Sequence, residues 1–153
     1  TIRPNSTNVL HSIAILYDEL KEWEKSDQIY NQLIQSDSSD AQACNNYAYS
    51  LVERNQSLNK ALKMAKKAIN IEPENPSYLD TIGWIYFKLN NHEKAKEYIE
   101  ASIKINGDNA VVLEHLGDIF MKIHKKDDAL KYYQQALNLD KNNARLIKKA
   151  SPE

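Results

Sequence analysis

The sequence predicts an all-α fold made of stacked helix pairs, that is, an α-α solenoid. In residues 76–109, apolar side chains recur at spacings of three and four on both sides of a polar turn, which indicates two amphipathic helices. The pattern returns 34 residues later, so that Leu79 and Gly83 become Leu113 and Gly117. A fixed period of this size is typical of helical repeats. The chain also contains only three glycines and four prolines, which disfavours an all-β fold because such a fold needs many turns.

The same period extends towards both ends of the chain and divides it into four helix pairs and a short final helix. The second pair needs one additional residue in its turn, near residues 55–57. We expect one domain over residues 1–153. Its predicted units are 7–40, 41–75, 76–109 and 110–143, followed by a capping helix at 144–150.

Signals at the ends of the helices place several boundaries. Ser6 or Thr7 is expected to cap the first helix after a short lead-in, and Asp40 and Asn75 are expected to cap later ones. We expect Ile147 to lie on the last full unit, because a terminal repeat needs a cap to cover its apolar face. The chain begins with Thr1, almost in register with a repeat, so we expect it to be a piece of a longer protein.

Small residues recur where two helices of a pair must approach each other. Ala14, Ala48, Gly83 and Gly117 occupy one position of the period, and alanines occupy a matching position on the partner helices. A larger side chain at such a contact would overpack it. The pattern therefore predicts which faces are buried.

Composition excludes several classes of function. Lys and Arg total 20 against 21 Asp and Glu, giving a net charge of −1, which lacks the basic excess of a nucleic-acid-binding protein. No apolar run approaches about 18 residues, the length of a membrane-spanning helix, and no signal peptide is evident. Cys44 is the single cysteine and lies on an apolar face, so we expect a buried thiol. The histidines lack metal-binding spacing, and we predict no catalytic residue, no cofactor and no metal site.

The repeated residues resemble the tetratricopeptide repeat pattern, W-x-x-L-G-x-x-Y followed by A-x-x-x-F and P. Leu113 stands in the tryptophan position, Gly83 and Gly117 match the glycine, and Pro73 matches the proline. The resemblance implies a right-handed superhelix whose first helices line a concave groove that binds a protein or peptide. Some family members bind the acidic C-termini of chaperones with a cluster of cations. Asp80 and Glu114 stand where those cations are needed, which disfavours that activity here.

Outward positions of the first helices supply the candidate groove contacts. Polar residues that hydrogen-bond a peptide backbone alternate there with two large aromatic rings and several carboxylates, a mixture typical of binding surfaces. The carboxylates indicate a partner with basic residues. It remains open whether Tyr49 and Trp84 contact a partner or only cover a neighbouring helix. The candidate residues are Asn46, Tyr49, Asp80, Thr81, Trp84, Glu114, His115 and Asp118.

The amino-acid sequence of the later repeats shows a narrower resemblance. NNYAYSL at 45–51, LDTIGWIYFKL at 79–89 and VLEHLGDIF at 112–120 are similar to the C-terminal repeats of bacterial tetratricopeptide proteins, many of them cell-envelope lipoproteins that act as scaffolds. We therefore expect a non-enzymatic interaction scaffold, with the parent protein in the bacterial cell envelope or, alternatively, the cytoplasm. Two other functions stay open: a cation-binding or accessory surface of an envelope enzyme complex, and a structural spacer or self-association segment.

Overall fold

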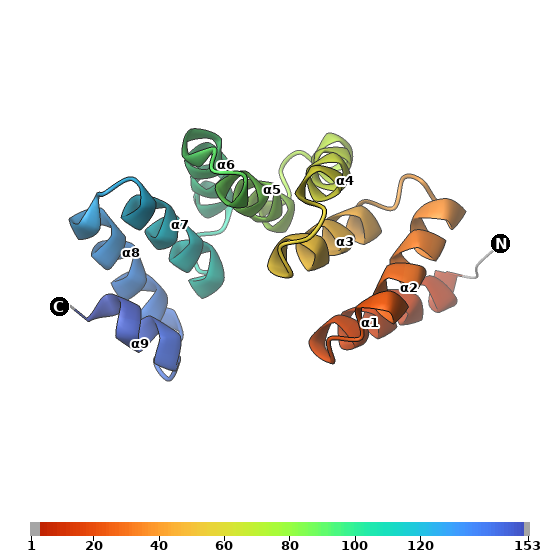
Figure 1. Cartoon of the computed structure of the whole chain (residues 1–153), viewed down its shortest axis with the longest axis horizontal. Helices are drawn as coiled ribbons and strands as arrows, with labels where there is room; N and C mark the ends of the chain where they lie inside the picture. Colours follow the sequence, from red (N-terminus) through yellow and green to blue (C-terminus); the bar gives the residue numbers. More distant parts are fainter. Residues whose placement is uncertain (1–3, 152–153) are drawn as a thin grey trace. The chain divides into compact units, whose positions relative to one another are not determined.

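The computed structural model describes residues 4–151, and every regular element in this part of the chain is an α-helix. Figure 1 shows the helices in chain order. Their bounds are α1 Pro4–Glu19, α2 Trp23–Ser36, α3 Ala41–Glu53, α4 Leu58–Ile71, α5 Pro76–Lys88, α6 His92–Ile105, α7 Ala110–Lys122, α8 Lys126–Leu139 and α9 Ala144–Ala150. The predicted all-α fold, with nine helical segments and a short last one, is confirmed for the described residues.

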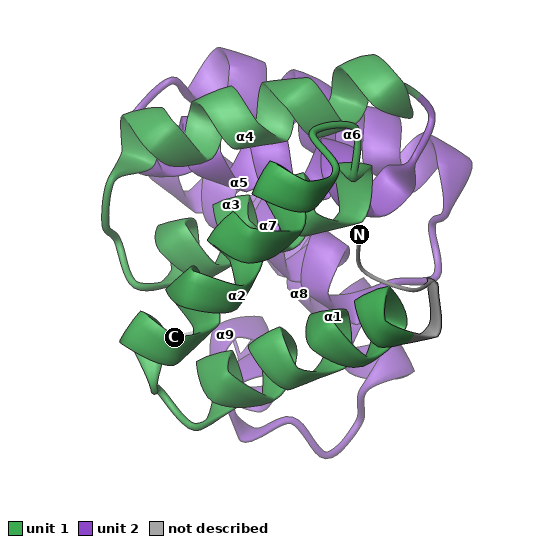
Figure 2. Ribbon diagram, turned by 90° about the vertical axis from the view of Figure 1, so that its right-hand side faces the viewer, with its two compact units in different colours: residues 1–73 green, residues 74–153 purple. Residues whose placement is uncertain are grey.

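The helices form two compact units, which Figure 2 shows in different colours. Unit 1 spans residues 1–73 with α1 to α4, and unit 2 spans residues 74–153 with α5 to α9. Within each unit, consecutive helices pack against each other, α1 on α2 and α3 on α4 in the first, α5 on α6 and α7 on α8 in the second. The grouping of all repeats into one domain over residues 1–153 stays a prediction.

Polar side chains at equivalent positions start the first helix of most pairs. Each accepts a hydrogen bond from a backbone N–H of the first helical turn, which would otherwise lack an acceptor. The helix-capping residues are Asp40, Asn75, Asn109 and Asn143. The expected start of the first helix after Ser6 or Thr7 is wrong, because α1 begins at Pro4, and proline is common at a first helical position, where its missing N–H is not needed. Residues 1–3 of the expected lead-in lie outside the described residues.

A left-handed residue closes the turn inside each helix pair. Lys21, Asn55, Asn90 and His124 occupy equivalent positions and have φ values of 59°, 52°, 60° and 61°. Ser57 is a second left-handed residue, with φ 47°, in the turn between α3 and α4. This turn contains the additional residue that the sequence pattern predicted, and Ser57 accommodates it.

The predicted close contacts between paired helices are present. A Cβ atom placed on Gly83 would lie 2.8 Å from the Ile99 Cδ1 and Cγ1 atoms, and one on Gly117 would lie 2.4 Å from Tyr133 Cε1. Ala14 and Ala48, at the same position of the period, are fully buried. The small residues therefore set the distance between helices, since a side chain at either glycine would displace its neighbour.

Helix α9 covers the end of unit 2 with a different residue from the one expected. Leu146 is 1% exposed and packs with Leu113 and Ala136, whereas Ile147 is 47% exposed. Leu146 follows Val112 by one period and takes the same place against the preceding helix pair. Ile147 follows Leu113, which packs in the core with the second helix of its own pair, and no helix after α9 is described. The prediction that Ile147 covers the last full unit is therefore wrong by one residue.

Candidate functional site

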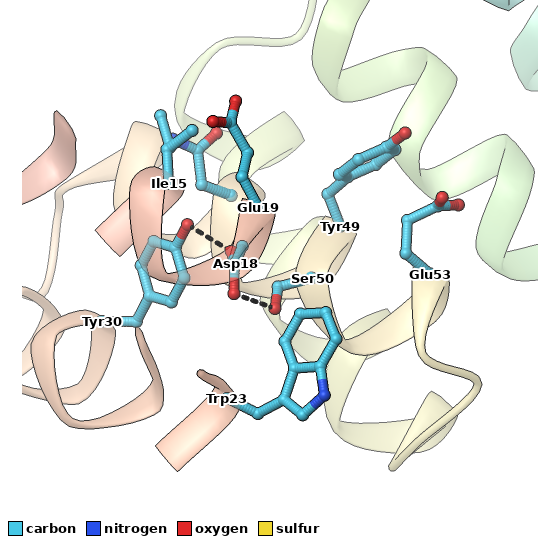
Figure 3. A pocket seen from close by; sticks show the side chains of 9 residues that line it. Ile15, Asp18, Glu19, Trp23, Tyr30, Tyr49, Ser50 and Glu53 are labelled. Atoms are coloured by element: carbon cyan, nitrogen blue, oxygen red, sulfur yellow. Dashed lines mark hydrogen bonds between the residues drawn. The ribbon is translucent and has the colours of Figure 1, made fainter. Parts of the chain in front are cut away.

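Unit 1 contains an open hollow between α1, α2 and α3, which we name the acidic hollow (Figure 3). Its volume is about 430 Å³. Figure 3 shows side chains of α1 and α3 on two sides and aromatic rings from α2 beside them. The lining residues are Ile15, Asp18 and Glu19 of α1, Trp23 and Tyr30 of α2, and Asn46, Tyr49, Ser50 and Glu53 of α3.

Asp18 is fixed in the hollow by two hydroxyl groups. Tyr30 Oη donates a hydrogen bond to Asp18 Oδ2 at 2.9 Å, and Ser50 Oγ donates one to Asp18 Oδ1 at 2.8 Å. Burial and the adjacent Asp18 carboxylate raise the pKa of the Tyr30 hydroxyl. The phenol therefore stays a neutral donor, and the carboxylate keeps one orientation.

Two carboxylates of the hollow carry negative charge that no ion pair neutralises. Among the described side chains, none forms an ion pair with Asp18 or Glu19. The nearby Arg54 guanidinium pairs with Asp27 instead and lies over the Trp23 ring, 5.4 Å from its centroid. A cation from outside the chain would thus find carboxylates that lack a cationic partner.

In unit 2 the predicted residues of α5 and α7 contact one another. The Trp84 ring is 7% exposed and stacks on His115, with ring centroids 4.0 Å apart, and on Phe87 at 4.7 Å. His115 Nδ1 lies 2.8 Å from Asp80 Oδ1, and both side chains are buried. The Trp84 ring, one of the candidate groove contacts, is therefore packed inside unit 2.

Helix α9 supplies cations to the two carboxylates of α7. Glu114 is 4% exposed, and its Oε1 lies 2.8 Å from Arg145 Nε and 2.7 Å from Lys149 Nζ. Lys149 Nζ also lies 2.6 Å from Asp118 Oδ1, which accepts a hydrogen bond from Tyr133 Oη at 2.7 Å. These carboxylates are thus paired within the chain.

The repeat explains why unit 1 has a hollow where α5 and α7 have packed rings. One period separates Ile15 from Tyr49, and a second leads to Trp84; by the same count Asp18 corresponds to Phe87. In unit 2 the Trp84 and Phe87 rings stack where unit 1 has an isoleucine and a carboxylate. The smaller side chains of α1 leave the space open.

The eight predicted contact residues therefore differ in their surroundings. Asn46 and Tyr49 line the acidic hollow. Thr81 is buried, and its hydroxyl donates to the Ser77 carbonyl oxygen of its own helix at 3.0 Å. Asp80, Trp84, Glu114, His115 and Asp118 make the contacts described above. Whether the eight form one continuous surface stays a prediction.

Sequence reasoning missed the cations of α9 and most of the acidic hollow. The signal for α9 was present, since Lys149 follows His115 by one period and Glu114 follows Asp80. Trp23, the first residue of α2, also lines the hollow. In the part of the chain that the structure describes, no three His, Cys, Asp or Glu side chains are grouped to hold a metal ion.

Comparison with known proteins decides the family. The sequence model described as tetratricopeptide repeat matches residues 2–149. The chain belongs to the tetratricopeptide repeat family. Its all-α fold is of the superhelical helix-pair class that the sequence predicted.

Relatives and solved structures agree with this family. A TPR repeat-containing protein of Pseudomonas aeruginosa is 24% identical over 96 residues, which cover 63% of this chain and 16% of that protein. The chain thus spans about one sixth of the length of that relative. A thermophilic TPR protein of Thermus thermophilus has a TM-score of 0.83 at 18% identity, covering 97% of this chain and 81% of the other. YrrB, described as a TPR protein with an unusual peptide-binding site, has a TM-score of 0.68 at 21% identity, covering 92% and 72%.

The tetratricopeptide fold supports a general role as a protein-interaction scaffold, with proteins or peptides as partners. Among the described helices, none has the length and apolar character needed to span a bilayer.

Proposed function

We propose that this chain is a non-catalytic scaffold whose acidic hollow receives a Lys or Arg side chain from an extended segment of a partner protein. The single observation that carries this proposal is the composition of the hollow. Three carboxylates and three aromatic rings line it, and none of the Lys, Arg or His residues that the structure describes does so.

The chemistry of the hollow matches both parts of a long cationic side chain. The apolar stem of Lys or Arg packs on apolar and aromatic surface, here Ile15, Trp23 and Tyr49. The charged head is attracted by carboxylates and by the faces of aromatic rings. Asp18 and Glu19 supply that charge from α1. Arginine fits best, because its planar guanidinium both stacks on rings and binds carboxylates in pairs.

Asn46 gives the hollow a group for the backbone of the partner. Its Oδ1 accepts a hydrogen bond from Asn45 Nδ2 at 3.4 Å, and an amide side chain offers both donors and an acceptor. The likeness to YrrB, itself described as having a peptide-binding site, supports a peptide as the ligand class.

The remaining predicted contacts, which belong to unit 2, are the weaker part of the proposal. Trp84 is stacked between other rings, and Glu114 and Asp118 are already paired with α9. A partner would have to displace these contacts before it could use them. We therefore assign the first contact to unit 1.

Location in the bacterial cell envelope is also a proposal, and it rests on the resemblance of the later repeats to envelope proteins. Fractionation of source cells, with an antibody against this chain, tests it. Recovery in the cytoplasmic fraction alone would contradict it.

A matched peptide pair tests the acidic hollow. One fluorescein-labelled nine-residue peptide carries a central arginine between leucines, and its twin carries citrulline, which has nearly the same shape without the charge. We expect the arginine peptide to bind the full chain about tenfold more tightly in low salt, because an exposed ion pair and a ring contact are each worth up to about 1 kcal/mol. Fluorescence anisotropy measures both affinities.

Variants locate the binding site. Glu19→Gln and Tyr49→Ala should each weaken binding of the arginine peptide and leave the thermal melt unchanged. Glu97→Gln is the matched control, because Glu97 is exposed on α6 and does not line the hollow. Equal binding of both peptides, or binding that neither hollow variant weakens, would refute the proposed function.

A further inference from the structure

Unit 2 contains a second hollow, which we name the basic hollow. It has a volume of about 410 Å³ and lies among the last turn of α7, helix α8, helix α9 and the residue that follows α9. Its lining residues are Met121, Lys126, Leu130, Tyr133, Arg145, Lys148, Lys149 and Ser151.

The basic hollow is the repeat equivalent of the acidic hollow. Counting along the period, Tyr133 corresponds to Tyr30, Met121 to Asp18, and Lys149 to Asn46. Both hollows therefore form where the two helices of a pair meet the first helix of the next. The charge is reversed, because four cationic side chains and, among the described residues, no carboxylate line the hollow in unit 2.

Two of the four cations lack a carboxylate partner. Arg145 and Lys149 pair with Glu114 and Asp118, as described above. Lys126 and Lys148 are exposed, and neither forms an ion pair with any described side chain. The pairs with Glu114 and Asp118 involve two of the cations, and Lys126 and Lys148 remain as positive charges at the hollow.

Apolar and aromatic side chains also line the basic hollow. Met121 is 44% exposed there, and Leu130 and the Tyr133 ring lie beside it. The Tyr133 hydroxyl donates to Asp118, so the ring is held in place. Methionine adapts its shape to different apolar partners. This apolar lining is suited to one apolar side chain, and the lysines to carboxylates next to it.

We propose that the basic hollow binds an acidic segment of a partner protein, in which an aliphatic residue is flanked by Asp or Glu. The aliphatic side chain would lie on Met121 and Leu130, and the carboxylates would pair with Lys126 and Lys148. This site is separate from the acidic hollow and does not depend on it. A peptide fits better than a nucleic acid, because apolar side chains line the hollow together with the cations and the chain as a whole has a net charge of −1.

The probe is a fluorescein-labelled eight-residue peptide with two leucines among six aspartates and glutamates, titrated with the full chain in low salt. Its twin has Asn and Gln in place of the acids. We expect the acidic peptide to bind and the neutral twin to bind at least about tenfold more weakly, with the difference shrinking as salt screens the charges. A single-stranded oligonucleotide of the same charge is the third probe and should bind more weakly than the acidic peptide.

Variants on one helix and its neighbour test the position. Lys126→Gln and Lys148→Gln should each weaken binding of the acidic peptide up to about fivefold, because an exposed ion pair contributes up to about that factor in affinity. Lys131→Gln is the matched control on α8, since Lys131 is exposed and does not line the hollow. Met121→Ser should weaken binding of the acidic peptide without changing how the affinity depends on salt.

Several results would overturn this inference. One is equal binding of the acidic and neutral peptides, and another is tighter binding of the oligonucleotide than of the acidic peptide. A third is a loss of affinity for the acidic peptide in Lys131→Gln that is as large as the loss in Lys126→Gln. If the labelled peptide fails to bind and sedimentation shows that the chain self-associates through the same lysines, a second copy occupies the hollow and the proposal is wrong.

Discussion

Lys149 binds Glu114 in the way that His115, one repeat earlier, binds Asp80. The Nζ–Oε1 distance is 2.7 Å in the first pair, the Nδ1–Oδ1 distance is 2.8 Å in the second, and each pair is separated by 35 residues in the sequence. The repeat brings a carboxylate of one first helix to a basic side chain of the next. Helix α9 continues this series with a lysine, so Glu114 and Asp118, two of the carboxylates predicted to attract a basic partner, are ion-paired within the chain.

Removing the α9 cations should destabilise unit 2. In Arg145→Gln/Lys149→Gln, the nearly buried Glu114 carboxylate loses both of its cationic partners. A buried polar group left without a partner typically costs about 1–3 kcal/mol, and exposure of Arg145 to water places this case towards the lower end. Urea unfolding measured by circular dichroism gives the change in the free energy of unfolding.

The neighbouring lysine provides the control for this prediction. Lys148→Gln removes one positive charge from α9, against two in the double variant, but breaks no ion pair among the described side chains, so it should unfold like the wild type. Adding Glu114→Gln to the double variant should restore part of the loss. If Lys148→Gln is as destabilising as the double variant, the net charge of α9 matters and the specific pairs do not.

Leu146 should hold α9 in place, and Ile147 should not. Leu146→Ala removes a side chain that is 1% exposed and packs on Leu113 and Ala136, and such truncations cost about 2–5 kcal/mol in a core. The short helix can fray, so we expect the lower end of that range. Ile147→Ala changes a side chain that is 47% exposed and should cost less than about 0.5 kcal/mol. Equal melting temperatures for the two variants would contradict the observed register.

The repeat pattern predicted the order of the helices and the close contacts within the helix pairs. The period placed the helix-capping residues Asp40 and Asn75 and the small residues at Gly83 and Gly117. Each unit needs an acceptor for the N–H groups at a helix start and a small side chain where its two helices meet. The prediction failed at Ile147 because the equivalent position in the earlier repeats is covered by the second helix of its own pair. At α9 the second helix of the pair is not described, so the position that is buried inside the chain becomes exposed.

The site was harder to predict than the fold. Equivalent positions were expected to have equivalent exposure, but exposure depends on which side chains fill the shared space. Trp84 fills its own position and is buried, whereas Ile15 is smaller and leaves the acidic hollow open. The pairing of Glu114 with Lys149 joins residues far apart in the sequence, and only the period links them.

Gly83 should tolerate no large side chain. Gly83→Leu places atoms where even a Cβ atom would lie 2.8 Å from Ile99, and overpacking of this kind costs about 1–3 kcal/mol. Ser77→Leu is the control on the same helix, because Ser77 is exposed, and it should have little effect. Thermal melts of both variants compare them. Combining Gly83→Ala with Ile99→Ala should be less harmful than the sum of the single changes, since the second change makes room for the first.

Cys44 should react slowly while the chain is folded. The thiol is fully buried, and burial raises its pKa above the ordinary value of a free thiol. A raised pKa in the fold means that the neutral thiol is favoured there, so this contribution to stability is present below the ordinary pKa and is lost as the pH rises through the folded value. At about pH 8.5, near the ordinary pKa of a free thiol, alkylation by iodoacetamide, followed by mass spectrometry, should proceed far faster in urea than in buffer. Equal rates would mean that the thiol is accessible in the folded chain.

Trp84 and Tyr49, which occupy equivalent positions, should respond in opposite ways to truncation. Trp84 is 7% exposed, between His115 and Phe87, so Trp84→Ala should cost about 3–5 kcal/mol and lower the melting temperature strongly. Tyr49 lines an open hollow and is partly exposed, so Tyr49→Ala should cost less than about 1 kcal/mol.

Measuring both stability and binding distinguishes a residue that contacts the peptide from one that only stabilises the fold. Tyr49→Ala should keep its melting temperature and lose affinity for the arginine peptide, while Trp84→Phe, which keeps a ring in the stack, should keep both. If Tyr49→Ala unfolds the chain as readily as Trp84→Ala, the tyrosine belongs to the core of unit 1, and the acidic hollow loses the aromatic wall on which binding of a cationic side chain depends.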